Sequence, residues 1–229
     1  MELAEIAFRP PVRVDDRRVA LADASGTVRL IDLLTGQVVW SAELGAEVRV
    51  PLVADPRAVV AFDQEGNTVV LDPATGDRRW EVELAGRSAV ILGDTLVVRN
   101  DAATIEGLDL GTGNRRWLAT DRGTLDAMAV FGDRVLVATQ LRTLVLDEDG
   151  RQVGALLPPY QWLTVAGSTV IGFGATETDI RGADLTVLRT LDTPDITLRS
   201  NQGVPPAAYR QGVYVFGKDW TFTAWSDEP

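Results

Sequence analysis

The residues from Asp72 to Trp80, with the sequence DPATGDRRW, form a motif that recurs along the chain and decides its fold. Two further clear copies run from Asp32 to Trp40 (DLLTGQVVW) and from Asp109 to Trp117 (DLGTGNRRW), and a degenerate fourth copy runs from Asp147 to Gly150 (DEDG). The glycines of the four copies follow one another at intervals of 40, 37 and 37 residues. A fixed period of this length is typical of repeat architectures, in which each repeat is one supersecondary unit.

Each residue type in the motif has a physical role in a tight turn between two strands. An Asp at the end of a strand accepts hydrogen bonds from the amides of the turn that follows it. The Gly after Thr permits a positive φ, which a β-branched residue would resist. The Trp supplies a large flat surface that packs between neighbouring sheets. The motif therefore predicts a hairpin whose second strand carries a packing tryptophan.

Residues 51–84 show the pattern of one complete repeat. Short apolar, β-rich runs occur there at 51–54, 58–62, 68–71 and 79–84, with turn residues between them. Four runs of this length separated by turns predict a four-stranded antiparallel meander. The same pattern is found in five further passages, at 12–44, 88–119, 126–157, 162–192 and 204–226.

The sequence therefore predicts an all-β protein, a six-bladed β-propeller of four-stranded antiparallel blades that forms a single domain over residues 1–229. The last repeat ends after its third strand, whereas Glu2–Phe8 is a strand-like segment that precedes the first repeat. We expect Glu2–Phe8 to complete the last blade and to close the ring, because closure removes exposed sheet edges. The blades are expected at about 9–45, 46–86, 87–123, 124–158, 159–203 and 204–229, the last together with 1–8.

The composition excludes several classes of partner and chemistry. The formal net charge is −11, which would repel the phosphates of nucleic acid and the headgroups of anionic lipid. The chain has no Cys and no His, so it lacks thiol ligands and the commonest general base. No apolar run approaches the length of a membrane span, and the acidic start Met1–Glu5 does not resemble a signal peptide. We expect no direct membrane insertion, and either a cytoplasmic protein or one whose leader or anchor has been removed.

The repeated pattern D-x-x-T-G-x-x-x-W after a β-rich strand resembles the repeat of pyrroloquinoline-quinone-type β-propellers. The match is clear over residues 12–119 and fades over 120–229. The resemblance implies that Trp40, Trp80 and Trp117 form a docking girdle between blades. This family includes quinoprotein alcohol dehydrogenases, the lipoprotein of the outer-membrane β-barrel assembly machinery, and sensor domains of bacterial kinases.

The resemblance implies the non-enzymatic, extracytoplasmic branch of that family more than its redox branch. The dehydrogenases hold their quinone against a vicinal disulfide, over a Trp and beside a Ca²⁺. This chain has no Cys, and it is far shorter than an eight-bladed quinoprotein. We therefore expect neither quinone nor any other cofactor.

Tyr160, Trp162, Tyr209, Lys218 and Trp220 are the candidate partner-binding residues. They lie in the divergent half of the chain, off the repeat phase and near Pro-rich connections. Aromatic side chains accompanied by one or two cations are typical of binding patches. The alternative is that these aromatics fill the core where the tryptophan of the motif has been lost.

Other candidate sites have simpler structural interpretations. The repeated aspartates of the motif lack the dense D-x-D-x-D-G spacing of a calcium loop, so turn capping accounts for them better than metal binding. The pairs Arg78–Arg79 and Arg115–Arg116 precede the tryptophans on the strand expected to be outermost, where charge opposes edge-to-edge pairing. We predict no catalytic residues and no metal ligands.

The sequence thus predicts a non-catalytic, monomeric scaffold or sensor module that binds a protein or peptide partner at the periplasmic or cell-surface side. A cytoplasmic location is the alternative. The alternative function is a small-ligand or Ca²⁺-dependent propeller enzyme, lactonase-like or a carboxylate-based hydrolase, that uses the central channel. Three or four Asp, Glu or Asn side chains converging on that channel would favour the enzyme.

Overall fold

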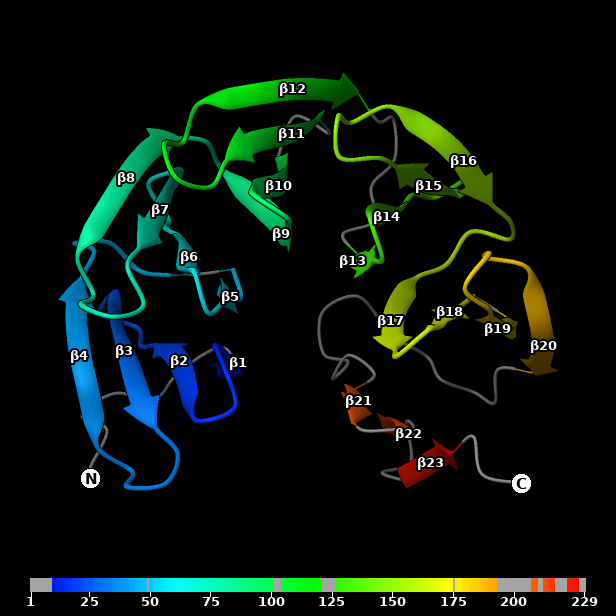
Figure 1. The fold of residues 1–229 in the computed structure, drawn as a ribbon, viewed down its shortest axis with the longest axis horizontal. Helices are drawn as coiled ribbons and strands as arrows, with labels where there is room; N and C mark the ends of the chain where they lie inside the picture. The colour runs from blue at the N-terminus through cyan, green and yellow to red at the C-terminus, as the bar shows by residue number, and fades with distance from the viewer. Residues whose placement is uncertain are drawn as a thin grey trace. The chain divides into compact units, whose positions relative to one another are not determined.

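The computed structural model describes residues 10–48, 50–100, 104–120, 127–174, 176–192, 207–209, 212–216 and 222–226. This part of the chain is all-β, with 23 strands in six antiparallel sheets and no helix (Figure 1). The predicted fold class is therefore confirmed, whereas the count of six blades and the closure of a ring stay predictions.

The chain divides into two compact units, Met1–Thr120 and Asp121–Pro229. In the first unit the strands are β1 (Val12–Arg13), β2 (Arg18–Ala22), β3 (Thr27–Asp32), β4 (Val38–Glu43), β5 (Val53–Asp55), β6 (Ala58–Phe62), β7 (Asn67–Leu71), β8 (Arg78–Glu83), β9 (Gly86–Leu92), β10 (Thr95–Asn100), β11 (Thr104–Asp109) and β12 (Arg115–Thr120). They form three four-stranded sheets in which each strand pairs with its neighbour in the chain. The predicted meanders are thus present in all three repeats of this unit.

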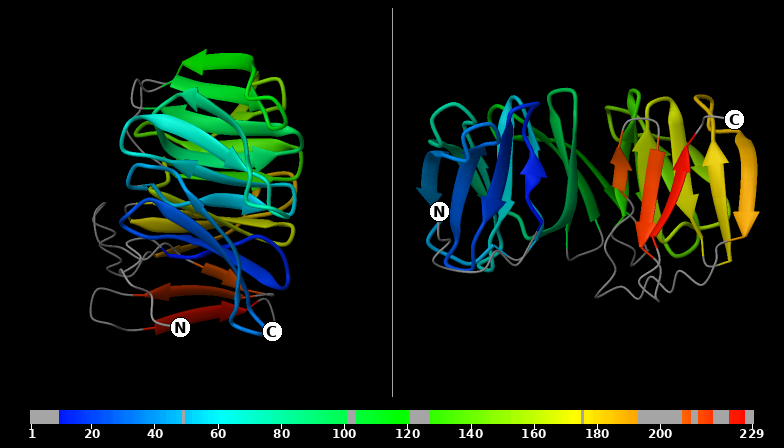
Figure 2. Two further views of the ribbon diagram at one scale, coloured as in Figure 1. Left: turned by 90° about the vertical axis from the view of Figure 1, so that its left-hand side faces the viewer. Right: turned by 90° about the horizontal axis from the view of Figure 1, so that it is seen from below.

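In the second unit the strands are β13 (Met128–Phe131), β14 (Arg134–Ala138), β15 (Thr143–Leu146), β16 (Gln152–Leu156), β17 (Trp162–Ala166), β18 (Thr169–Phe173), β19 (Glu177–Arg181), β20 (Val187–Asp192), β21 (Ala207–Tyr209), β22 (Gly212–Phe216) and β23 (Phe222–Ser226). Two sheets have four strands each, and the described residues of the last sheet form three, β21 to β23. Consecutive strands of each sheet run antiparallel, and the arrows of β21, β22 and β23 show this order in the right view of Figure 2.

One irregularity recurs between the third and fourth strands of all five four-stranded sheets. In the first sheet Leu30 pairs with Trp40 while Ile31 pairs with Val38, so that Val39 is an extra residue on β4. Such a β-bulge bends its strand and increases the local twist. The extra residues of the other four sheets are Arg79, Arg116, Val153 and Leu188. The bulge places an exposed side chain directly before the position that carries the tryptophan in the first three repeats.

The core of the first unit lies between its sheets. Successive side chains of β6 point to opposite faces of the second sheet, as they do in any strand. Val59 and Ala61 belong to the core shared with the first sheet, whereas Ala58, Val60 and Phe62 belong to the core shared with the third. All five are buried, which explains why this strand is a continuous apolar run.

In the described part of the second unit, a comparable core lies between the first two sheets. Phe131, Leu136 and Val145 of β13, β14 and β15 pack there against Val170 of β18 and Leu185 of the β19–β20 turn. Both units therefore stack four-stranded sheets face to face, the packing expected of consecutive propeller blades.

Candidate functional site

Two of the predicted docking tryptophans contact the motif turn of the next repeat. Trp40 on β4 is 8% exposed, and its indole Nε1 donates a hydrogen bond of 3.1 Å to the carbonyl oxygen of Pro73. Trp80 on β8 is 9% exposed, and its Nε1 donates a hydrogen bond of 2.9 Å to the carbonyl oxygen of Leu110. Each indole thus meets a hydrogen-bond acceptor at the same position of the following repeat.

The glycine of the motif allows the indole to approach this closely. A Cβ on Gly76 would lie 2.7 Å from Cδ2 of Trp40, and a Cβ on Gly113 would lie 2.8 Å from Cδ2 of Trp80. Both glycines also have a positive φ, +80° and +76°, which other L-residues rarely adopt. We call the motif turn, with its acceptor carbonyl and its glycine, a docking turn.

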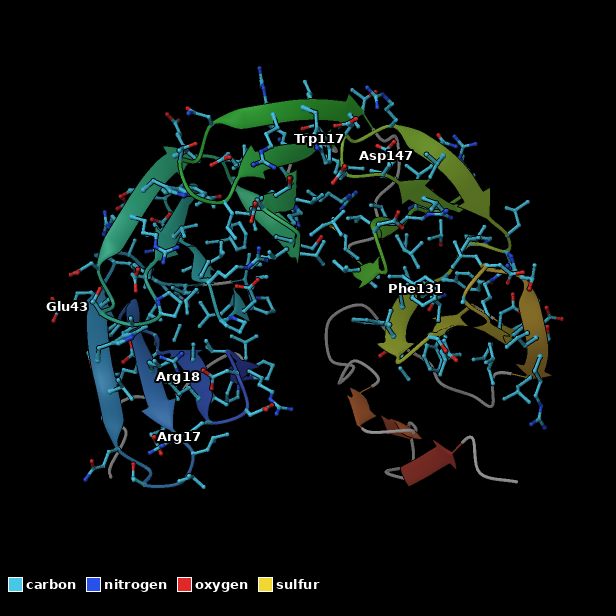
Figure 3. All side chains as sticks on the ribbon, in the orientation of Figure 1. Arg17, Arg18, Glu43, Trp117, Phe131 and Asp147 are labelled. Atoms are coloured by element: carbon cyan, nitrogen blue, oxygen red, sulfur yellow. The ribbon has the colours of Figure 1, made fainter. Side chains whose placement is uncertain are left out.

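Trp117 is the third predicted docking residue, and its docking stays a prediction. It is half-buried on β12, and its indole lies against Gly107 of β11 in the same sheet (Figure 3). A Cβ on Gly107 would lie 2.2 Å from Cε2 of Trp117. This ring therefore packs on the glycine that pairs with it across the sheet.

The motif aspartates cap their turns and bind the arginine of the bulge. Oδ1 of Asp109 accepts hydrogen bonds from the amide of Thr112 at 2.8 Å and from its hydroxyl at 2.9 Å, and Oδ2 lies 2.6 Å from the guanidinium of Arg116. The bond from Arg116 is the main reason why the pKa of Asp109 falls to about 2. Asp72 is held in the same way by Arg79 at 2.6 Å, which lowers its pKa. These arginines therefore stabilise their own turns, in addition to any effect of their charge on the exposed edge.

In the first repeat the aspartate of the motif is also paired with an arginine, but this arginine comes from another turn of the sheet. Val39 occupies the bulge position, and the cation comes instead from Arg17 in the β1–β2 turn, whose Nε lies 2.5 Å from Oδ2 of Asp32 (Figure 3). Asp32 also accepts the amides of Leu34 and Thr35 at 2.9 and 3.0 Å, and these bonds, chiefly that of Thr35, lower its pKa. The Asp of each clear motif copy is thus a turn cap, as its spacing suggested.

The predicted partner-binding residues are not assembled into one exposed surface by the described part of the chain. Tyr160 is completely buried, so it is a core residue and not part of an exposed patch. Trp162, at the start of β17, is half-buried. Tyr209 lies on β21, of which only the backbone is described, and Lys218 and Trp220 lie outside the described residues. For Tyr160 the alternative interpretation, an aromatic that fills the core, is the correct one.

Tyr160 is buried because three polar side chains satisfy its hydroxyl and one another. The hydroxyl donates to Oδ2 of Asp179 at 2.5 Å and accepts from Nε of Arg181 at 2.7 Å. Thr190 donates to the other carboxylate oxygen at 2.7 Å. Burial, followed by the bond to Asp179, raises the pKa of the Tyr160 phenol. A buried charge pair with its hydrogen bonds made is a structural element, not a free acid or base.

The same hydrogen-bond network also stabilises the β19–β20 turn, which takes the place of the motif turn in the fifth repeat. Arg181 donates hydrogen bonds to the carbonyl oxygens of Leu185 at 2.8 Å and of Leu157 at 2.6 Å. The ring of Tyr160 lies on Gly172 of β18, where a Cβ would come within 2.6 Å of it. An aromatic ring over a glycine thus recurs here with a tyrosine, away from the repeat phase of the tryptophans.

Exposed apolar side chains are the candidate interaction feature that sequence reasoning missed. The described residues expose these large hydrophobic side chains: Leu33, Leu34, Val38, Val39, Leu118, Leu141, Val153, Leu157, Val187 and Leu188. Four of them fall in one stretch of the first repeat, from Leu33 to Val39. Clustered exposed apolar residues are typical of interaction surfaces. The available signal was the contrast between this stretch and its copies, which carry arginine pairs before the tryptophan.

Two further searches of the described residues gave negative findings. They contain no group of three or more Asp or Glu side chains placed to hold a metal ion. They also contain no helix with the length and hydropathy that crossing a bilayer requires.

Comparison with known proteins relates the chain to one family. The sequence profile of the family described as outer membrane protein assembly factor BamB matches residues 24–158. Among solved structures, BamB from Moraxella catarrhalis is similar at 22% identity, covering 99% of this chain and 72% of that chain with a TM-score of 0.73. The computationally designed Ika8 protein is similar at 17% identity, covering 95% and 70% with a TM-score of 0.75. No protein of curated function matches the chain.

Proposed function

Because the chain belongs to the family of the outer membrane protein assembly factor BamB, we propose that it is a non-catalytic β-propeller scaffold that binds a protein or peptide partner in the bacterial cell envelope. The observation that carries this proposal is the family match over residues 24–158, more than half of the chain. The matched region includes both tryptophans that contact the docking turns of the following repeats.

The chemistry of the described ionisable groups supports a binding role over a catalytic one. The buried pair Asp179 and Arg181 is bonded to Tyr160, to Thr190 and to backbone carbonyls, so that its hydrogen-bonding capacity is used within the fold. The aspartates of the motif turns are engaged as caps. The exposed apolar side chains, in contrast, are groups that a partner could cover.

The partner-binding surface proposed from the sequence is retained without Tyr160. Trp162 is half-buried on β17 and keeps part of its ring accessible. Tyr209, Lys218 and Trp220 remain candidates on sequence grounds, as aromatic and cationic side chains in the divergent half of the chain. We propose that a partner contacts this half.

We further propose that residues 1–229 form one monomeric, six-bladed domain closed by Glu2–Phe8. The support is the strand count of the described residues, in which five sheets have four strands and the sheet β21–β23 has three. A fourth strand added beside β23 would satisfy the hydrogen-bonding groups of that edge. Deletion of residues 1–8 should therefore lower the melting temperature and produce oligomers in size-exclusion chromatography with light scattering. A deletion variant that stays monomeric with an unchanged melting temperature would contradict this closure.

The binding function is tested by capture in the cell envelope. The tagged product of the whole gene is produced in the bacterium that encodes it, cross-linked in vivo, and purified from separate envelope and cytosolic fractions, with an acidic protein of similar size and charge as the control. We expect the chain in the envelope fraction, cross-linked to a recurrent envelope protein that the control does not capture. A chain that fractionates with the cytosol and captures no specific protein, or that hydrolyses lactone or glycoside substrates, would refute the proposal.

A further inference from the structure

We draw no further inference here: the strongest candidate, the set of exposed aliphatic side chains that Val153, Leu157, Val187 and Leu188 present on β16, directly after it and on β20 of the second unit, carries none, because nothing in the described part of the chain shows what covers them.

Discussion

Replacement of Trp80 by alanine tests the structural basis of the repeat most directly. Its indole is 9% exposed, packs on Gly113 and donates a hydrogen bond to the carbonyl oxygen of Leu110. A buried Trp removes roughly 200 Å² from water, which at about 25 cal/mol per Å² gives an upper bound of about 5 kcal/mol. Measured losses for large aromatic residues replaced by alanine are about 3–5 kcal/mol. We expect Trp80→Ala to lower the free energy of unfolding by that amount.

The assay is thermal unfolding followed by circular dichroism at a β-sheet wavelength. For a chain of this length, a loss of about 3–5 kcal/mol corresponds to a fall in melting temperature of roughly 6–20 °C. Trp80→Phe keeps most of the packing and loses the indole hydrogen bond, so it should cost only about 1 kcal/mol from that bond. Trp117→Ala, at a half-buried position, should cost less than Trp80→Ala. An unchanged melting temperature in Trp80→Ala, or an equal loss in Trp117→Ala, would refute this account of docking.

Three further predictions follow from the turns and from the buried network. Gly113→Ala should lower the melting temperature more than Gly36→Ala, since both have a positive φ but, in the described part of the chain, only the former faces an indole, that of Trp80; equal shifts would be inconsistent with this. Asp109 has a folded-state pKa of about 2, below its ordinary value of 3.8, so its contribution to stability is complete above about pH 4 and is lost as the pH falls toward 2. In acid unfolding followed by circular dichroism, the stability of Asp109→Asn should therefore depend less on pH between about 4 and 2 than that of the unaltered chain. Identical pH profiles would count against a stabilising role of Asp109 as a turn cap. Tyr160→Phe should cost about 1–3 kcal/mol in urea unfolding, because it removes one hydrogen-bond partner from each of two buried charged groups, Asp179 and Arg181; a cost near zero would show that the network is dispensable.

The recurrent motif made the architecture predictable because nine residues contain an aspartate that caps the turn, a glycine with a positive φ and a tryptophan that packs between sheets. Each of these has a local physical reason, so Asp72, Gly76 and Trp80 could be assigned to their roles from spacing alone. The meanders of all three repeats in the first unit agree with that interpretation. Spacing did not indicate that Gly107 is the cross-strand partner of Trp117, at the position held by Leu30 and Val70 in the first two repeats.

The candidate site was less predictable, because exposure is a property of the fold and not of a residue. Tyr160 follows two prolines and lies off the repeat phase, which suggested a surface position, but Asp179 and Arg181 satisfy its hydroxyl in the core. Those partners lie 19 and 21 residues away, and nothing in the local pattern connects them. Leu34 and Val39, in contrast, were visible as departures from the repeat consensus, although the sequence alone did not show that both side chains are exposed.

The divergent fifth repeat shows how the fold tolerates the loss of its motif. In the docking turns the Asp amide bonds to a carbonyl five residues later, but in the fifth repeat the amide of Gly182 bonds to Thr186, only four residues later. The left-handed position of this shorter turn is occupied by Leu185, with a φ of +65°. A non-glycine residue held there costs on the order of 1 kcal/mol or more and persists only when its surroundings fix it. Arg181 provides that constraint through its 2.8 Å bond to the carbonyl of Leu185, and Tyr160 in turn fixes Arg181. In the first unit, glycine adopts the left-handed position of the turn without strain and the indole packs on it. In the fifth repeat, the buried network stabilises a turn of the same kind through hydrogen bonds, although Leu185 is strained at that position.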